Sequence, residues 1–486
     1  MRKQPFRVVF YLLLASIVTA SGLLWHRQTA QQEGARLARA HQLRALVEDR
    51  GLQPLHPPPD DDETLVELGR LLFFDPILSG NRDVSCATCH DPALATVDRL
   101  PLAVGTGGEG VGAERTTGQG RSFVSRNTHD LFNRALPGWE AAFWDGRVME
   151  SGPGRYETPA GAYLPAGLDN LLAAQAMFPV TLRHEMRGGA YNVDTYTAGP
   201  GTAGGRDREA PAGWHDVDVY GRPNELAAIP DGAQHAPAIW EAVMARLLAI
   251  PQYEQLFRRA YPQQAVHELG FHHAANALAA FQADAFTFVD SPWNRYLAGD
   301  DGALSPQAQA GALLFFGEAG CAACHAPPLF TDHGYHNIGA PQFGPGHDAY
   351  APLDFGRYHV TGDEADRYAF RTPSLLNVSF TAPYLHNGAY GSLEDVVRHH
   401  LQPEAALRRY EGRELPLALQ TTVQNEPVTI DAILRTLDPE LAPERELSAA
   451  DVAALLAFLE ALGDPRAAAA PHLAPEAVPS GLPLGR

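Results

Sequence analysis

Two short motifs combine thiols and an imidazole at a spacing suited to a covalently bound haem. Cys86-Ala-Thr-Cys89-His90 and Cys321-Ala-Ala-Cys324-His325 each hold two cysteines three residues apart, followed directly by a histidine. Thiols at this spacing reach the two vinyl groups of one porphyrin, and the histidine then offers its imidazole to the iron. The motifs use all four cysteines of the chain, so no thiol remains for a disulfide. We therefore expect two haem c groups.

Two other kinds of site also use a C-x-x-C pair. A zinc site needs a second ligand pair at a suitable spacing, and a thioredoxin-like redox pair does not need the adjacent histidine in both copies. Two complete copies without a spare cysteine favour haem over both alternatives.

Composition restricts the class of protein. The chain has 486 residues, of which 45% are hydrophobic and 19% charged, so it is long enough for two or three globular domains. Its formal net charge of -20 argues against nucleic acid as a partner, because phosphate binding needs a concentrated basic surface. An acidic surface also steers basic redox partners, but the charge alone identifies none.

The N-terminus predicts export. Arg2, Lys3 and Arg7 precede an uncharged run from Val8 to Trp25, which predicts a signal or anchor segment over residues 1–30. The leading positive charges would stay in the cytoplasm and the following chain would be exported. The apolar run continues past the candidate cleavage site at residues 18–20, which favours an uncleaved inner-membrane tether over a cleaved signal peptide. Either way we expect a periplasmic protein.

Helical patterns precede both motifs. After a linker over residues 31–59, leucines between residues 65 and 72 follow helical spacing, and Asp75-Pro76 ends that helix. Before the second motif, the segment 311–316 repeats the segment 69–74. We therefore predict a mainly α fold with two cytochrome c-like haem domains packed together, over residues 60–290 and 291–465, and joined by long loops.

Three further segments have distinct compositions. Residues 188–232 are rich in Gly, Asp, Pro and Tyr and predict a surface insertion, which is a lid, a partner-binding loop or inert. Helical patterns resume over 237–260 and 265–288, and Ser448 predicts the N-cap of a last helix. The Ala/Pro-rich segment 466–486 predicts a flexible tail.

Several motifs in one order carry a family resemblance. They are Gly69-Arg-Leu-Leu-Phe-Phe-Asp-Pro76, Phe143-Trp-Asp-Gly-Arg147, Glu185-Met186, Phe370-Arg-Thr-Pro-Ser-Leu375 and Thr381-Ala-Pro-Tyr-Leu-His-Asn-Gly388. Together they resemble the bacterial dihaem cytochrome c peroxidase family, which includes the MauG enzymes. The resemblance implies that the N-terminal haem meets hydrogen peroxide and that the C-terminal haem passes or stores electrons. It also implies that His90 and His325 are the proximal iron ligands.

The resemblance also implies roles for single residues. Trp144 matches the tryptophan between the haems, although a Trp before Asp-Gly is also commonly core. Glu185 matches the distal glutamate that moves a proton during peroxide cleavage, and Gln175 matches a glutamine that accompanies it in MauG-like members. Without this resemblance, Glu185 would ordinarily be interpreted as a lone glutamate on a surface turn.

The resemblance also implies a bound calcium ion. Asn127, Thr381 and Pro383 match positions at which the family holds the ion, and oxygen donors suit a hard cation. Asn127 is also compatible with an ordinary turn.

The chain departs from ordinary peroxidases at both haems. Many members carry a histidine sixteen residues after the first proximal one, where this chain has Thr106, and residues 91–128 contain no histidine or methionine. We therefore expect the iron of the N-terminal haem to have a free coordination position in the newly made protein.

At the second haem, all five methionines precede the motif. The family's ligand position falls on His400, which is a tyrosine in MauG-like members. His399 and an empty site are the alternatives, and imidazole in place of methionine should lower the haem potential.

Three functions follow from these features. The first is a peroxidase that takes electrons from a small periplasmic donor, a cytochrome c or a cupredoxin, and reduces hydrogen peroxide. The second is a MauG-like enzyme that uses peroxide to oxidise a side chain of a protein substrate. The third is a dihaem electron carrier without catalysis, against which Glu185 and an open haem argue.

Overall fold

Helices dominate the structure, a computed structural model that describes residues 26, 30–31, 33–118, 121–189, 217–347, 350–442 and 444–484. After a helix over residues 33–49, the α-helices are α2 (Glu63–Phe74), α3 (Cys86–Cys89), α4 (Leu171–Ala176), α5 (Ala236–Leu248), α6 (Pro251–Ala260), α7 (Phe271–Ala285), α8 (Pro292–Leu297), α9 (Pro306–Phe316), α10 (Tyr358–Thr361), α11 (Leu393–Leu401), α12 (Pro403–Arg409), α13 (Leu417–Gln420), α14 (Pro427–Leu434) and α15 (Ala449–Ala461). The prediction of a mainly α fold is confirmed.

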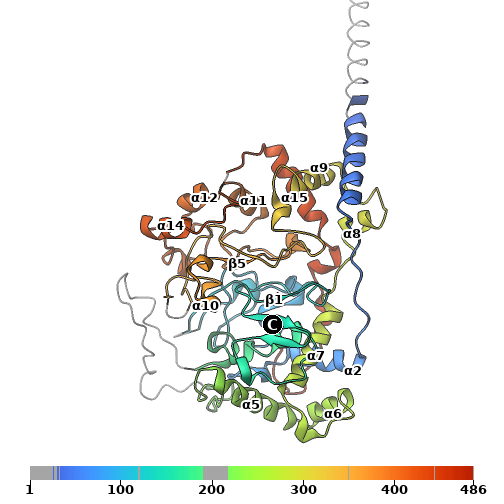
Figure 1. Cartoon of the computed structure of the whole chain (residues 1–486). Coiled ribbons are helices and arrows are strands. Elements are labelled where there is room, and N and C mark those ends of the chain that lie inside the picture. The colour runs from blue at the N-terminus through green and yellow to red at the C-terminus, as the bar shows by residue number, and fades with distance from the viewer. Residues whose placement is uncertain are drawn as a thin grey trace, which may run out of the picture.

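Strands are short. β1 (Ala141–Ala142), β2 (Val148–Gly152) and β3 (Arg155–Glu157) form an antiparallel sheet in this order. β4 (Tyr335–His336) pairs antiparallel with β5 (Phe370–Arg371). Both lie between the two groups of helices in Figure 1.

The repeated sequence segments form the same packing in both copies. Gly69 of α2 faces α7 so closely that a Cβ atom there would lie 1.8 Å from the Ala277 carbonyl oxygen. Gly311 of α9 faces α15 in the same way, with the Ala454 carbonyl oxygen at 1.8 Å. Each glycine therefore allows two helices to cross at backbone contact, just before a haem motif.

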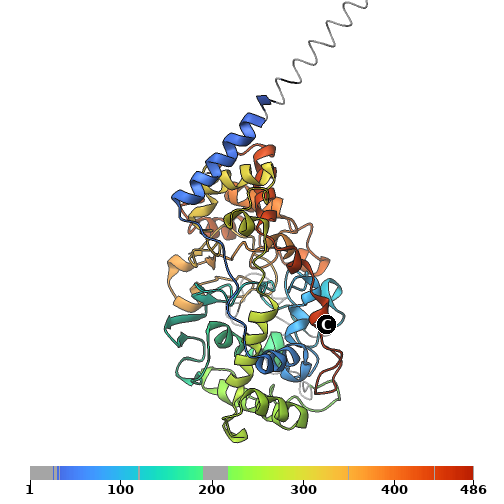
Figure 2. The same cartoon turned by 90° about the vertical axis from the view of Figure 1, so that its right-hand side faces the viewer.

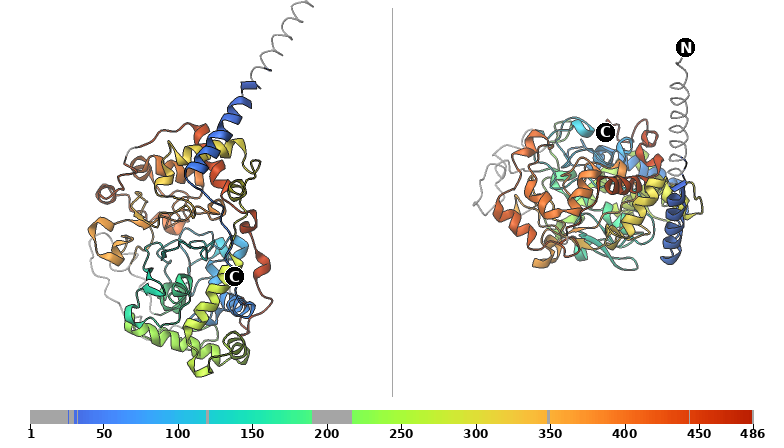
Figure 3. Two further views of the ribbon diagram at one scale, coloured as in Figure 1. Left: turned by 45° about the vertical axis from the view of Figure 1, so that its right-hand side comes forward. Right: turned by 90° about the horizontal axis from the view of Figure 1, so that it is seen from above.

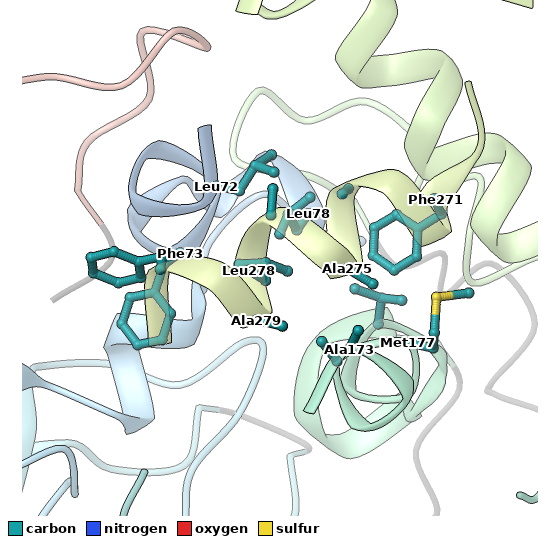
Figure 4. Packing of buried hydrophobic residues seen from close by; sticks show 14 of the residues in the cluster. Leu72, Phe73, Leu78, Ala173, Met177, Phe271, Ala275, Leu278 and Ala279 are labelled. Atoms are coloured by element: carbon teal, nitrogen blue, oxygen red, sulfur yellow. The ribbon is translucent and has the colours of Figure 1, made fainter. Parts of the chain in front are cut away.

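Aromatic side chains fill the space beside both crossings. Phe73 contacts Phe281 at 5.2 Å between ring centres in the first copy, and Phe315 contacts Phe458 at 5.2 Å in the second. In Figure 4, α7 lies between α2 and the segment that carries Ala173 and Met177. Burial of these rings makes each crossing the centre of a hydrophobic cluster.

The two groups of helices lie one above the other. Figure 1 shows α2, α5, α6 and α7 in the lower half of the view, and α8, α9, α11, α12, α14 and α15 in the upper half. The domain boundaries at residues 60–290 and 291–465 stay predictions.

The ends of the described chain cross between the halves. Leu43 and Val47, in the predicted linker, are buried in the hydrophobic cluster of the upper half, and the blue helix that carries them lies against that half in Figures 1 and 3. The C-terminal segment returns to the lower half, as Figure 2 shows. There Val478 and Leu482 are buried in the first cluster, and Ser480 Oγ donates a 2.6 Å hydrogen bond to Asp75. The described part of the predicted flexible tail is therefore packed, because its apolar residues find a core to cover.

Other sequence predictions have mixed outcomes. Ser448 caps α15 as predicted, and Ser305 caps α9 in the same way. The helical pattern over 237–260 is divided at Pro251, which begins α6.

Of the predicted insertion, residues 190–216 lie outside the described residues, and buried Asp218 pairs with Arg82 in the part that is described. The predicted anchor at residues 8–25 also lies outside them, and no described helix is long and apolar enough to cross a membrane.

Candidate haem and peroxide site

The first C-x-x-C-H motif forms a single helical turn that ends at the histidine. Cys86 to Cys89 make up α3, and His90 is its C-terminal cap. The Nδ1 atom of His90 lies 3.2 Å from the Thr96 carbonyl oxygen. A carbonyl oxygen only accepts hydrogen bonds, so Nδ1 carries the proton and Nε2 is left to bind a metal.

The second motif repeats this arrangement. His325 Nδ1 lies 3.2 Å from the Phe330 carbonyl oxygen, which again leaves Nε2 without the proton. Burial lowers the pKa of both motif histidines to about 4, so the imidazoles are neutral and able to coordinate iron.

A second imidazole faces His325 across a gap that fits one iron atom. His400 Nδ1 donates to the Val396 carbonyl oxygen at 2.8 Å, which leaves its Nε2 free. The ring centres of His325 and His400 are 6.4 Å apart. A metal–nitrogen bond is about 2.0 Å long, so two imidazoles that share one metal ion have ring centres roughly 6 Å apart. These residues therefore fit a haem iron with two histidine ligands.

The neighbouring His399 has no free nitrogen. Its Nε2 lies 2.8 Å from the Ile338 carbonyl oxygen, and its Nδ1 lies 2.9 Å from the Tyr390 hydroxyl. Only 1% of its surface is exposed, whereas His400 is half-buried. The geometry therefore favours His400 over His399 as the ligand.

The first haem motif has no comparable partner among the described residues. His129 approaches His90, but a ring separation of 5.5 Å is too short for one iron between them. Thr106, where many relatives have a ligand, is buried and donates a 2.7 Å hydrogen bond to Asp83. This geometry is compatible with an iron that is open on the side opposite His90.

Glu185 lies against the loop that carries Thr106. It belongs to a short π-helical turn, Arg183–Arg187, and its carbonyl oxygen accepts a hydrogen bond from the Thr106 backbone N–H at 2.8 Å. A Cβ atom on Gly105 would lie 2.5 Å from the same carbonyl oxygen, so only glycine permits this contact. Such π-turns are frequent at functional sites.

Burial raises the pKa of the Glu185 carboxyl group. Arg147 and Arg126 oppose this rise, and Asp145 adds to it. A carboxyl group with a raised pKa exchanges protons closer to neutral pH. Gln175, on α4, is half-buried, and its side chain makes no hydrogen bond to the described residues.

Trp144 lies between the segments that belong to the two haem motifs. Its indole N–H donates to the Asn127 carbonyl oxygen at 3.0 Å, and its own carbonyl oxygen accepts from the Arg371 N–H at 2.8 Å. It is half-buried. The tryptophan is thus fixed to both halves of the molecule.

The three predicted calcium positions are only partly brought together. The Asn127 N–H donates to the His386 carbonyl oxygen at 2.8 Å, which joins it to the loop of Thr381 and Pro383. The Asn127 side-chain amide donates to the Leu100 carbonyl oxygen at 2.8 Å, which leaves its own oxygen for a cation.

A group of buried cations was missed by sequence reasoning. Arg371 is 3% exposed and has no ion pair among the described residues, and burial, with Arg134 nearby, lowers its pKa to about 9. Arg134 Nε, His333 Nδ1 and the Tyr335 hydroxyl are buried without hydrogen-bond partners. Both arginines and His333 contact the Trp139 ring. Two buried arginines beside unsatisfied donors fit the two carboxylates of a haem.

A buried ion network was missed as well. Arg126 forms ion pairs with Asp145 at 2.6 Å and with Asp354 at 2.7 Å. Asp145 directly follows Trp144, so the network holds the tryptophan segment to the C-terminal half. The only hint in the sequence was the position of Asp145 in the Phe-Trp-Asp-Gly-Arg motif.

One further cluster resembles a metal site. Ligand atoms of Cys324, Asp332 and His336 lie within 4.8 Å of one another. Cys324 belongs to the second haem motif, however, and a thioether bond to haem would remove the thiolate that a metal needs. The cluster therefore gives no separate metal site.

Two haem motifs with preformed imidazole geometry define a c-type dihaem protein, and comparison with known proteins gives its family. A family model described as di-haem cytochrome c peroxidase matches residues 63–302. The methylamine utilization protein MauG of Methylorubrum extorquens is 32% identical over 69% of this chain and 68% of its own. Cytochrome c551 peroxidase of Pseudomonas aeruginosa is 29% identical over 68% of this chain and 70% of its own.

The fold is also found among solved structures. A MauG-like protein associated with microbial copper homeostasis superposes with a TM-score of 0.53 at 24% identity, covering 87% of this chain and 96% of its own. The chain belongs to the dihaem cytochrome c peroxidase family, which includes the MauG proteins.

Proposed function

We propose that this chain is a periplasmic enzyme that reduces hydrogen peroxide at an open N-terminal haem, with electrons relayed through a C-terminal haem from a small cytochrome c or cupredoxin. Cys86, Cys89 and His90 would hold the first haem, and Cys321, Cys324, His325 and His400 the second. When bound, haem iron supplies the site for peroxide and the capacity to store electrons. The protein supplies the proton transfer, the positioning and the path between the two sites.

Glu185 is the proton-transfer group in this proposal. Cleavage of the peroxide bond needs a proton to move from one oxygen to the other, so that water leaves. The raised pKa of Glu185 suits this task because it brings the carboxyl group closer to the pH at which it both gives and takes a proton. Gln175 would supply hydrogen bonds beside it.

The observation that carries the proposal is the contrast between the two proximal histidines. The ring of His325 lies 6.4 Å from that of His400, whereas His90 has no comparable ligand among the described residues. Glu185 is close enough to the first motif to raise the pKa of Cys89. Asymmetric iron sites of this kind suit one haem that reacts and another that exchanges electrons. Trp144 would connect them, and calcium bound near Asn127 would stabilise this junction.

A MauG-like oxidation of a protein side chain is the second candidate. The absence of a methionine after the second motif favours it, because imidazole ligation lowers the potential and makes electron collection from a high-potential donor less favourable. A long-lived oxidised state after peroxide addition without a donor would support this candidate.

Replacement of Glu185 tests the proposed function. We expect Glu185→Gln to slow the reaction of the diferric protein with peroxide by about 10²–10⁴-fold, because the amide cannot transfer the proton. Stopped-flow absorbance with both haems loaded measures this rate. Because burial raises the Glu185 pKa, the wild-type rate should fall with decreasing pH at a higher pH than for an ordinary glutamate, and the variant should lose this dependence.

The exposed Glu150 provides a matched control. Glu150→Gln removes the same charge from β2 and should react like the wild type. A wild-type rate and pH profile in Glu185→Gln, with intact haem content, would remove Glu185 from the mechanism.

A further inference from the structure

The Tyr390 hydroxyl is hydrogen-bonded to the imidazole of His399. The Ile338 carbonyl oxygen accepts from His399 Nε2, so that nitrogen carries the proton and Nδ1 has the free lone pair. The Tyr390 hydroxyl, 2.9 Å from Nδ1, must then donate to it. Burial lowers the pKa of His399, so the resting phenol keeps its proton. Loss of an electron makes a phenol a strong acid, and the proton then moves along this existing hydrogen bond to the imidazole.

The ring of Tyr390 also begins a short aromatic path to the second haem site. The ring centres of Tyr390 and His399 are 5.4 Å apart, and those of His399 and His400 are 6.1 Å apart. His400 is the proposed iron ligand, whose ring centre lies 6.4 Å from that of His325. Tyr390 is therefore two ring contacts from the proposed iron ligand.

The same ring opens on the other side into a cavity. A hollow of about 730 Å³ is bounded by α11, α12 and the segment 445–447, and both Tyr390 and Tyr410 line it. A volume of this size accommodates a small organic molecule. Arg409 and Arg445 also line it and have no ion-pair partner among the described residues.

The second tyrosine of the cavity differs in one decisive contact. Tyr410 packs against Tyr390 at 5.7 Å between ring centres, but its hydroxyl donates to the Ala389 carbonyl oxygen at 3.0 Å. A backbone carbonyl oxygen cannot take up a proton at neutral pH. Tyr410 thus forms an aromatic wall, and Tyr390 alone of this pair has a base beside it.

We propose that Tyr390 is a redox-active residue through which a small phenol or hydroquinone, bound in this cavity, delivers electrons to the C-terminal haem. The inference rests on the proposed function, because hydrogen peroxide is the oxidant. One electron leaves the Tyr390 ring toward the His400 side, and the phenolic proton moves to His399 Nδ1, which leaves a neutral tyrosyl radical. The bound hydroquinone then returns an electron to Tyr390, which recovers its proton from His399, and the hydroquinone proton passes to solvent.

Two such transfers balance the reaction. One hydroquinone gives up two electrons and two protons and becomes a quinone, while one hydrogen peroxide takes up two electrons and two protons and becomes two molecules of water. Reductants that release electrons and protons together are therefore the class that suits this cavity, and they would supply electrons in addition to the small protein donor of the proposed function.

Rapid freezing after peroxide addition tests the inference on the holoprotein. Wild-type protein made with ring-deuterated tyrosine should give an EPR signal narrowed by deuterium, which identifies a tyrosyl radical. Tyr390→Phe should lose this signal, and its steady-state oxidation of benzene-1,4-diol should also be lost. Tyr410→Phe is the matched control, since it removes a hydroxyl from the same cavity, and its signal should persist. His399→Gln should lose the signal while Tyr390 is still present.

The outcomes separate this inference from the function on which it rests. If wild-type protein does not react with peroxide at all, the proposed function is wrong. If it consumes peroxide but the radical persists in Tyr390→Phe, or if Tyr410→Phe abolishes it, the redox role of Tyr390 is wrong. Unchanged diol oxidation in Tyr390→Phe would likewise overturn the inference.

Discussion

Adjacent histidines on one helix take different tasks because their nitrogens meet different partners. Both belong to the last turn of α11, where successive side chains point about 100° apart. This rotation turns His399 toward Ile338 and Tyr390, and it turns His400 toward His325. One backbone acceptor for each histidine, Ile338 or Val396, sets which nitrogen carries the proton.

A comparison of the two histidines tests this assignment. We expect His400→Ala to convert one of the two ferric haems from low-spin to high-spin, because its sixth ligand is lost. His399→Gln should keep the low-spin state. EPR and absorbance spectra of the ferric holoproteins measure the change, and a high-spin conversion in His399→Gln alone would reverse the assignment.

At the scale of elements, the crossing of α2 with α7 has the same close packing as the crossing of α9 with α15. Gly69 and Gly311 each let a helix approach the carbonyl group of another, and the haem motif follows within a short distance along the chain. The crossing fixes the direction from which each motif leaves its helix. Phenylalanines around both crossings bury enough apolar surface to hold the helices in place.

A methyl group at either crossing should reduce stability. We expect Gly69→Ala and Gly311→Ala each to lower the free energy of unfolding by about 1–3 kcal/mol, because the backbone of the facing helix must move. Thermal denaturation followed by circular dichroism gives the comparison. Gly34, exposed in the helix over 33–49 with no atom within 4 Å of its Cβ position, is the control, and Gly34→Ala should be neutral or slightly stabilising. Equal stability of all three variants would contradict the close packing.

At the scale of the whole molecule, the two halves are joined by a buried ion network beside Trp144. Burial by itself raises the pKa of Asp145, but Arg126 and Arg147 outweigh this effect and hold it well below its usual range. Asp354 behaves in the same way through Arg126 and a hydrogen bond from His359. Arg126 therefore neutralises one carboxylate from each half.

Loss of Arg126 should destabilise the molecule in a pH-dependent manner. We expect Arg126→Met to cost about 3–5 kcal/mol at neutral pH, because, among the described residues, buried Asp354 loses its only arginine partner and buried Asp145 keeps only Arg147. A lowered pKa contributes stability that is present above the unfolded-state pKa and is lost as pH falls through the folded-state pKa. The difference from the wild type should therefore shrink as pH falls below about 4. Chemical denaturation at several pH values measures it.

An exposed arginine supplies the control for this prediction. Arg408 pairs with Glu404 and Asp431 at the surface, and Arg408→Met should leave the free energy of unfolding close to that of the wild type at every pH. A cost for Arg126→Met as small as this would mean that the network does not hold the halves together.

Local rules determined much of this protein from its sequence. The expectation of haem attachment follows from two thiols and an imidazole at a fixed spacing, and the helix start at Ser448 follows from a side chain that caps its own backbone. The repeat of segment 69–74 in segment 311–316 was visible in the sequence, because the same close helix packing requires a glycine at the same place in both copies. The family was also evident, because its motifs are contiguous in the chain.

Contacts between distant segments were decided only by the tertiary structure. The choice of His400 over His399 depends on carbonyl groups that no motif predicts, and the pairing of Arg126 with Asp354 joins residues more than two hundred positions apart. Burial raises the pKa of Glu185. Val478 and Leu482 pack into the first hydrophobic cluster, where the sequence predicted a flexible tail. The spacing of residues in the sequence specifies which thiols, imidazoles and carboxyl groups can take part in a site. Segments far away in the sequence bury these groups in the fold, and so they decide the protonation of each group and its hydrogen-bond partners.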